Sequence, residues 1–318
     1  MHLTRLAAWI SALALTLCGA SMVSAQNYPN KVVRIVTAAP GSNNDWGARI
    51  IAQELYRSFG QSVIVENRGG VAVEVTAKAP PDGYTLMFYG NTVWLLPFLR
   101  DNVPYDPVRD LAPITLAVTS PIIIVVHPSL PVKSVKELIA LAKAKPGQLN
   151  YAAGTIGASP HLATELFKAM TGTNILRVPY KGTGPSVIAL VGGEVHLMFA
   201  GLGSVAPHIK SGRLRALAVA TANPSALTPG LPTVAEAGVP GFEAASMIGM
   251  FAPAKTPPAI INLLNQEIVR GITRPEVKEL FFNSGAEVVA NTPEEFAAII
   301  KSEMARLGKV IREAGIHE

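Results

Sequence analysis

The chain has 318 residues, of which 49% are hydrophobic and 15% are charged, and its formal net charge is +5. This length and composition suit a globular protein of about two domains. Basic residues form no run and do not cluster with aromatic residues, which argues against a nucleic-acid-binding protein.

The first 25 residues have the pattern of a secretory signal peptide. Arg5 precedes an apolar stretch from Leu6 to Ala20, and small side chains precede Gln26. The stretch is shorter than the ~20 apolar residues that a membrane-spanning helix needs. We therefore expect cleavage near Ala25-Gln26 and a mature protein in the periplasm.

The only cysteine, Cys18, lies inside this segment and leaves with it. A lipoprotein anchored at Cys18 is the weaker alternative, because Leu17 stands where a small residue is expected. After cleavage no thiol remains, which excludes disulfides, cysteine–metal sites and cysteine nucleophiles. Cleavage also removes Arg5, so the formal charge falls to +4.

From residue 31 onward, β-branched runs alternate with amphipathic segments, in which pairs such as Trp46/Ile50 have helical spacing. The expected strands are 31–38, 61–67, 84–90, 120–128, 148–154, 175–182, 195–201, 213–221 and 246–254. The expected helices are 45–59, 69–80, 135–145, 160–172, 185–193, 204–212, a short one after Thr233, 256–272, 274–285 and 292–315. Ser134 and Thr292 head capping boxes, and Ser159 is the expected N-cap of a helix that starts at Pro160.

Strands and helices that alternate at this spacing predict an α/β fold with mainly parallel sheets flanked by helices. The stretch after Pro253 is nearly all helical and is expected to pack back on the first sheet. The predicted domains are therefore a discontinuous domain 1, residues 26–126 and 249–318, and a domain 2, residues 127–248.

Motifs for other functions are incomplete. The G-x-G-x-x-G and G-x-x-x-x-G-K-[ST] fingerprints are lacking, which argues against a nucleotide site. No G-x-S-x-G occurs, and Ser159 and His161 are expected to diverge at a helix start, so an exported hydrolase is a remote alternative. The histidines of the exported chain form no close pair, which argues against a metal site. They are His127, His161, His196, His208 and His317.

Five strand-to-helix loops consist mainly of small residues. They span residues 37–45, 90–92, 154–159, 180–184 and 200–204. Because each follows an expected parallel strand, they should lie at the carboxyl ends of the sheets, where open α/β sheets bind ligands. Helix N-termini there offer free N–H groups and positive potential, so a carboxylate can bind without Lys or Arg. The alternative is that Gly and Ser serve only as turn residues.

Longer motifs follow one another along the chain: PPDGYTL, VPYDPVRDLAPI, YAAGTIGASPHLATELFKAMTG, PYKGTGPS, LVGGEVHLMFAG, PHIKSGRLRALAVAT and LPTVAEAGVPGFE. Together they resemble the Bug family, the extracytoplasmic solute-binding receptors of tripartite tricarboxylate transporters. The resemblance runs from Tyr28 to Ile316. It implies a two-lobed, type II-like periplasmic binding protein that closes a cleft by hinge motion, without a cofactor or enzymatic activity.

The resemblance also implies a small organic carboxylate as ligand and a two-component membrane permease as partner. We expect a monomer. The carboxylate is a di- or tricarboxylate or an aromatic acid. A role as the ligand-sensing partner of a membrane sensor kinase is the main alternative. In the family, loops after the first two strands bind one carboxylate of the ligand through N–H groups and waters. The second lobe contributes segments that match Gly154–His161 and Pro179–Gly182.

The candidate ligand-binding residues follow from these loops and matches. They are Ala38, Ala39, Pro40, Gly41, Ser42, Asn43, Asn44, Asp45, Asn91, Thr92, Thr155, Gly157, Ala158, Ser159, His161, Tyr180, Lys181, Gly182, Ala200 and Gly201. If Trp46 or Trp94 lined the cleft, an aromatic acid would be favoured over a citrate-like ligand.

The chain departs from the family pattern in two loops. Ser42 and Asn43 replace two glycines of the usual first loop, P-P-G-G-G-T-D. The second loop, after Asn67-Arg68, is several residues shorter than usual. Ala189 and Ala200 stand where the family often has Asp. These departures predict fewer backbone donors from the second loop and more side-chain amides in the first.

Overall fold

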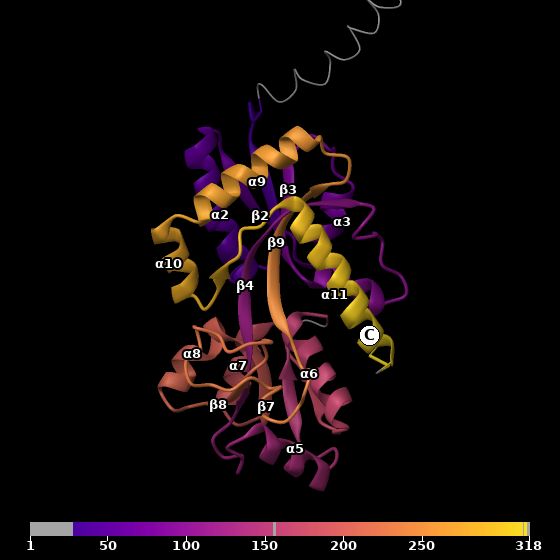
Figure 1. The fold of residues 1–318 in the computed structure, drawn as a ribbon, viewed down its shortest axis with the longest axis vertical. Helices are drawn as coiled ribbons and strands as arrows, with labels where there is room; N and C mark the ends of the chain where they lie inside the picture. Colours follow the sequence, from indigo (N-terminus) through magenta and orange to yellow (C-terminus); the bar gives the residue numbers. More distant parts are fainter. Residues whose placement is uncertain (1–27, 155–156, 314, 317–318) are drawn as a thin grey trace, which may run out of the picture.

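A computed structural model describes residues 28–154, 157–313 and 315–316. The predicted signal peptide, Thr155 and His317 lie outside these ranges. The described chain forms two α/β lobes, between which β4 (Leu111–Val126) and β9 (Ala245–Pro253) run through the middle of the molecule (Figure 1). The expected two-lobed α/β architecture is thus confirmed.

The first lobe contains β9 and the first part of β4. Its other strands are β1 (Val33–Thr37), β2 (Val63–Asn67), β3 (Thr85–Gly90) and β10 (Glu287–Val288). Its helices are α2 (Asn43–Phe59), α3 (Ala72–Ala77), α4 (Thr92–Leu95), α9 (Pro258–Ile272), α10 (Pro275–Asn283) and α11 (Pro293–Glu313), with short 3₁₀ helices η1 (Gly69–Val71) and η2 (Leu96–Phe98). The last three α-helices therefore return to the first lobe, as their place after β9 requires.

The second lobe is built around the end of β4. Its other strands are β5 (Asn150–Ala153), β6 (Leu176–Pro179), β7 (Leu197–Gly201) and β8 (Arg215–Val219). Its helices are α5 (Val135–Ala144), α6 (Ser159–Thr171), α7 (Thr183–Val191) and α8 (Leu202–Lys210). The Thr233–Glu236 capping box forms its two hydrogen bonds, but only turns follow it.

The sheets are mixed, whereas mainly parallel sheets were expected. β1 pairs in parallel with β2 and β3, and β5 pairs in parallel with β6 and β7. The crossing strands β4 and β9 pair antiparallel with each other and with their other neighbours. One crossing strand leaves the first lobe and the other returns to it, so the two must run in opposite directions.

The change of lobe occurs within β4. Pro121 pairs with Ala245 of β9 in the first sheet, and Ile122 pairs with Gly201 of β7 in the second. The domain limits given above remain a prediction. The sequence pattern missed the first part of β4, because Pro113 and two register shifts interrupt the alternation that identifies a strand.

Among the described residues, one apolar cluster joins the lobes, on one side of the molecule. One core cluster contains residues of both lobes, among them Trp94 and Phe296 of the first and Phe167 and Phe199 of the second. The cluster around α2, α9 and α10 contains first-lobe residues alone, and the cluster around α7 and α8 second-lobe residues alone. In Figure 1 the joined side carries α6 and α11, and the opposite side carries α8 and α10.

Candidate functional site

Three strand ends meet between the lobes. The loop after β1 leads into Asn43 and Asn44, at the start of α2. A Cβ placed on Gly201, at the end of β7, would lie 3.8 Å from Asn43 Nδ2. One placed on Gly90, at the end of β3, would lie 3.9 Å from Asn44 Oδ1. The side-chain amide of Asn43 therefore faces a strand end of the second lobe, at the edge where open α/β sheets bind ligands.

Hydrogen bonds connect the lobes beside α4. Ser159 Oγ donates to Asn91 Oδ1 at 2.5 Å, and Thr92 Oγ1 donates to the Gly157 carbonyl at 3.2 Å. Asn91 is 3% exposed and Ser159 8%. The prediction that Ser159 caps α6 is wrong, because Ala158 is the N-cap and Ser159 is the first helical residue. The Ser159 hydroxyl bridges the lobes instead.

His161 lies in the first turn of α6, is 7% exposed and is neutral. Its Nδ1 accepts a hydrogen bond from the Gly157 amide at 3.3 Å, so the ring hydrogen is on Nε2. Burial is the main reason that the His161 pKa falls from 6.5 to about 4. Arg177 lowers this pKa further, Glu165 raises it and Lys168 lowers it. The imidazole is therefore a donor group that stays uncharged at neutral pH.

The helices that follow β5, β6 and β7 begin without a side-chain cap among the described residues. Their N-cap residues are Ala158, Gly182 and Gly201. Gly182 has a φ of 104°, which favours glycine. By contrast α5, which does not start at the gap between the lobes, is capped by Ser134. Uncapped helix starts keep N–H groups and the positive end of the helix dipole available to an anion.

Asp45, a predicted ligand residue, directs its carboxylate into its own loop. Oδ2 accepts from the Gly41 amide at 2.9 Å. Oδ1 accepts from Asn67 Nδ2 and from Arg49 Nη2, each at 2.9 Å. Burial raises the pKa of Asp45, but the hydrogen bonds from Asn67, Gly41 and Arg49 outweigh it and hold the pKa below its usual value. The backbone amide of Asp45 is bonded to the N-cap side chain of Ser42.

The other predicted residues differ in exposure. Lys181 is exposed, and the Tyr180 hydroxyl donates to Glu194 Oε2 at 3.4 Å. The side chain of Ala200 is buried in the core of the second lobe. The exposed or half-buried residues of the first loop are Ala38, Ala39, Pro40, Gly41, Ser42, Asn43 and Asn44.

The two tryptophans of the described chain have different environments. Trp94 is fully buried and packs against Phe251 and Phe296 in the core. Trp46 is 38% exposed, and its ring packs edge-on against Phe281 of α10 at 5.3 Å. Trp94 is thus a core residue, whereas Trp46 is partly exposed and in contact with Phe281.

On the α8 side, the backbones of the two lobes make a close contact that the sequence did not predict. A Cβ on Gly203 of α8 would lie 2.1 Å from the Ser284 carbonyl in the first lobe. The next residue, Gly285, accepts a hydrogen bond from Ser120 Oγ of β4 at 2.6 Å. No sequence signal marks Gly203, because its role depends on a segment far along the chain.

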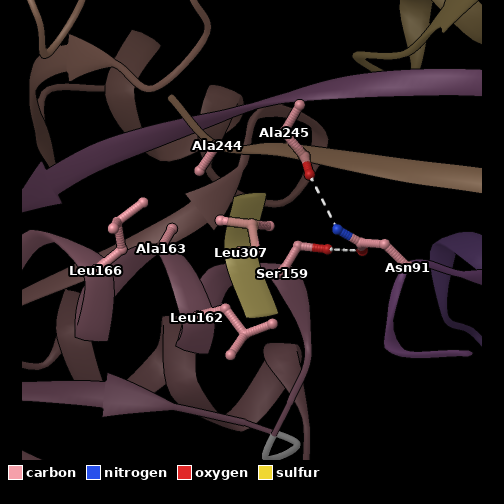
Figure 2. Close-up of a pocket in the computed structure, with 8 residues that line it drawn as sticks. All are labelled: Asn91, Ser159, Leu162, Ala163, Leu166, Ala244, Ala245 and Leu307. Carbon is pink, nitrogen blue, oxygen red and sulfur yellow. Dashed lines mark hydrogen bonds between the residues drawn. The ribbon is translucent and has the colours of Figure 1, made fainter. Parts of the chain in front are cut away.

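Figure 2 shows a small cavity beside the Asn91–Ser159 hydrogen bond. Its volume is about 20 Å³, which suffices for one water molecule. Asn91 and Ser159 supply its polar groups, and the Asn91 amide also donates to the Ala245 carbonyl at 3.4 Å. The other lining residues are Leu162, Ala163, Leu166, Ala244, Ala245 and Leu307. The bridge between the lobes is therefore backed by apolar packing.

Two further properties concern the described residues only. Within 28–154, 157–313 and 315–316, no group of three or more His, Cys, Asp or Glu side chains could hold a metal ion. In the same part of the chain, none of the helices combines the length and the apolar character needed to span a membrane.

Comparison with known proteins gives matches over nearly the whole chain. A family model described as "Tripartite tricarboxylate transporter family receptor" matches residues 47–316. The protein BugT of Bordetella pertussis is 38% identical over 322 residues, which cover 99% of each chain. The solved structure "R. palustris Rpa4515 with adipate" has a TM-score of 0.84 at 36% identity, covering 91% of this chain and 98% of the other. MatC (Rpa3494) of Rhodopseudomonas palustris, with bound malate, has a TM-score of 0.79 at 28% identity, covering 89% and 100%.

Proposed function

The chain belongs to the tripartite tricarboxylate transporter receptor family, and we propose that it closes its two lobes on a small aliphatic dicarboxylate. The receptors of this family are periplasmic and bind their ligand for a transporter in the membrane; they are not enzymes. The exported hydrolase considered for Ser159 and His161 is therefore set aside.

The observation that carries the proposal is the opposition of two kinds of donor across the gap. The second lobe presents the uncapped starts of α6, α7 and α8. The first lobe presents the side-chain amides of Asn43 and Asn44, close to Gly201 and Gly90. Donors on both sides suit a ligand with an anionic group at each end, which lobe closure would bury.

Two related proteins support an aliphatic diacid as the ligand class. Their structures contain adipate and malate, which are both aliphatic dicarboxylates. An aromatic acid would be favoured over a citrate-like ligand if Trp46 or Trp94 lined the cleft, but Trp94 is buried in the core. The proposed site comprises the loop that leads into Asn43, the Asn91–Thr92 segment, and the helix starts at Ala158, Gly182 and Gly201.

Export and assembly follow the same proposal. The signal peptide would be cleaved near Ala25-Gln26, and the mature monomer would deliver its ligand to a two-component permease. Closure around the ligand would give the permease a shape that differs from that of the empty receptor. A sensor kinase would read the same shape, so it remains a second partner class.

A thermal-shift series on protein purified from the periplasm tests the ligand class. Adipate, malate, citrate and benzoate are compared with adipamide, which has the length of adipate but no charge. A ligand present at 100 times its Kd should add about 2.7 kcal/mol to the free energy of unfolding. We expect the largest shift with an aliphatic dicarboxylate and none with adipamide. If none of the carboxylates raised Tm, the proposed function would be wrong.

A further inference from the structure

We propose that Asp45 and Asn67 form a brace that fixes the first ligand loop, so that Asp45 is a positioning residue and the second loop supports the first. This proposal rests on the proposed function in one respect, namely that the first loop contacts the ligand. Its geometry stands independently of which ligand binds.

Asn67 ties the two ends of the first loop together. Its Nδ2 donates to the Ala38 carbonyl at 2.8 Å and to Asp45 Oδ1 at 2.9 Å. Arg49 Nη2 donates to Asn67 Oδ1 at 3.2 Å, which fixes the orientation of the amide. Ala38 is the first residue after β1, and Asp45 lies in the first turn of α2. A single side chain at the end of β2 therefore sets the span of the loop.

Asp45 fixes the interior of the same loop. Its Oδ2 holds the Gly41 amide at 2.9 Å, and its own amide donates to Ser42 Oγ at 3.2 Å. The Ser42 hydroxyl in turn donates to the Ala39 carbonyl at 2.7 Å. The Gly41 amide is thus engaged inside the loop. The amides of Asn43 and Asn44 precede the first hydrogen bond of the helix, so a ligand can use them.

The electrostatics also favour a positioning role over a ligand contact. A free carboxylate beside an anion site would repel the ligand. Asp45 is only 6% exposed, and Arg49 lies 2.9 Å from Oδ1. Both carboxylate oxygens accept hydrogen bonds from this cluster, which keeps Asp45 ionised and its charge balanced. The loop can therefore present its amides without exposing a negative charge.

The second loop has little free length for a ligand contact. After Asn67, the Arg68 amide donates to the Thr37 carbonyl at 2.9 Å, so the chain still follows β1. η1 begins at Gly69, and the Gly69 carbonyl accepts from the Tyr89 hydroxyl at 3.2 Å. The chain then enters α3 with Ala72 fully buried. The shortened second loop therefore supports the first loop through Asn67 and has little chain left to contact a ligand.

Asp45→Asn tests the brace with two measurements. The new amide group would face the Gly41 amide, Asn67 Nδ2 or Arg49, all of which are donors. With adipate as the probe, calorimetry should show at least about tenfold weaker binding, as expected for loss of a buried charged acceptor. Hydrogen exchange of the segment 38–46 in the ligand-free protein should accelerate, while exchange in the core strands stays unchanged. General destabilisation would instead raise exchange in the core strands as well.

Asp110→Asn is the matched control. The Asp110 carboxylate accepts from the Asp106 amide at 2.8 Å and from Arg109 Nε at 2.7 Å. It precedes β4 at the end of the first lobe remote from the crossing. This variant should exchange faster near residue 106 and bind adipate like the wild type.

Two results would overturn the brace. One is unchanged exchange of segment 38–46 in Asp45→Asn. The other is wild-type adipate affinity in that variant. Exchange needs no ligand, so a wild-type protein that bound no dicarboxylate would count against the proposed function, and the exchange result would still decide the brace.

Discussion

The start of α2 in the first lobe and the starts of α6 and α8 in the second are prepared in opposite ways. The first lobe caps α2 with Ser42 and braces the preceding loop through Asp45 and Asn67. The second lobe begins α6 at Ala158 and α8 at Gly201 with no side-chain cap in the described chain. The loop of the first lobe thus loses its conformational entropy when the protein folds and not when the ligand binds. The helix starts of the second lobe keep N–H groups without a side-chain partner. Such a division favours binding, because only the open donors need to change partners when the ligand arrives.

The largest predicted difference between the lobes is the pH dependence of stability. His161 of the second lobe has a pKa of about 4 when folded and 6.5 when unfolded. Between these pH values the unfolded chain binds a proton that the folded chain excludes, so stability falls as the pH decreases from 6.5 towards 4. The loss should reach roughly 2–3 kcal/mol at the low end. The pKa of Asp45 is lowered, so its contribution is lost only below this window.

Denaturant unfolding at pH 7 and pH 4.5 measures this difference in wild type and His161→Gln. Glutamine retains an acceptor for the Gly157 amide and cannot titrate. The variant should lose less stability than the wild type over this interval. The groups around the imidazole are Arg177, Glu165 and Lys168, and the variant leaves all three in place. Equal losses in the two proteins would show that the pH sensitivity does not belong to His161.

A second prediction concerns the contact through which the lobes meet. Gly203→Ala places a methyl group where the Ser284 carbonyl lies 2.1 Å away, so the lobes must separate on the α8 side. The substitution should stabilise α8 slightly, because alanine favours a helix over glycine. Adipate binding should nevertheless weaken about tenfold, which corresponds to about 1.4 kcal/mol.

Gly192→Ala is the control, because a Cβ there meets its nearest neighbour at 3.4 Å, within the same lobe. Calorimetry with adipate should give wild-type affinity for it. If Gly203→Ala also bound like the wild type, the backbone contact would have no part in closure. The first lobe would then bind the ligand without needing this contact with the second lobe.

The placement of several strand-end loops could be predicted from the sequence, because it depends on strand order. The loops after β1, β3 and β7 were expected at one edge of the sheets, and Asn43 does lie beside Gly201 and Asn44 beside Gly90. The Thr292–Glu295 capping box also formed both of its hydrogen bonds as expected. These features follow from local pattern and from the direction of the chain.

The features that escaped prediction depend on partners far along the chain. Ser159 looked like an N-cap, but its hydroxyl reaches Asn91 in the other lobe. Gly203 is distinguished from the other glycines only by its close contact with the Ser284 carbonyl, which lies far along the chain. Trp94 could line a cleft or a core, and only the neighbouring aromatic rings decide between them. A local pattern cannot report contacts that tertiary packing creates.

The smallest predicted effect comes from giving the second lobe the kind of cap that the first lobe has. Ala158 has φ −66° and ψ 151°, which suit an N-cap residue. Ala158→Ser would let the hydroxyl accept from the amide of His161, since Pro160 has none to donate. The free energy of unfolding should rise by about 0.5–1 kcal/mol. Adipate binding should weaken a few-fold, because the new cap occupies a donor that the ligand uses.

Ser134→Ala completes this comparison from the opposite direction. The Ser134 hydroxyl caps α5 by accepting a hydrogen bond from the Glu137 amide at 3.2 Å. Its removal should lower the free energy of unfolding by about 1 kcal/mol. Its adipate affinity should stay at the wild-type value, because α5 does not start at the gap. Thermal unfolding and calorimetry on both variants therefore separate stability from binding. If Ala158→Ser raised Tm and left the affinity unchanged, the start of α6 would not be a ligand donor, and the contrast between the lobes would rest on α7 and α8 alone.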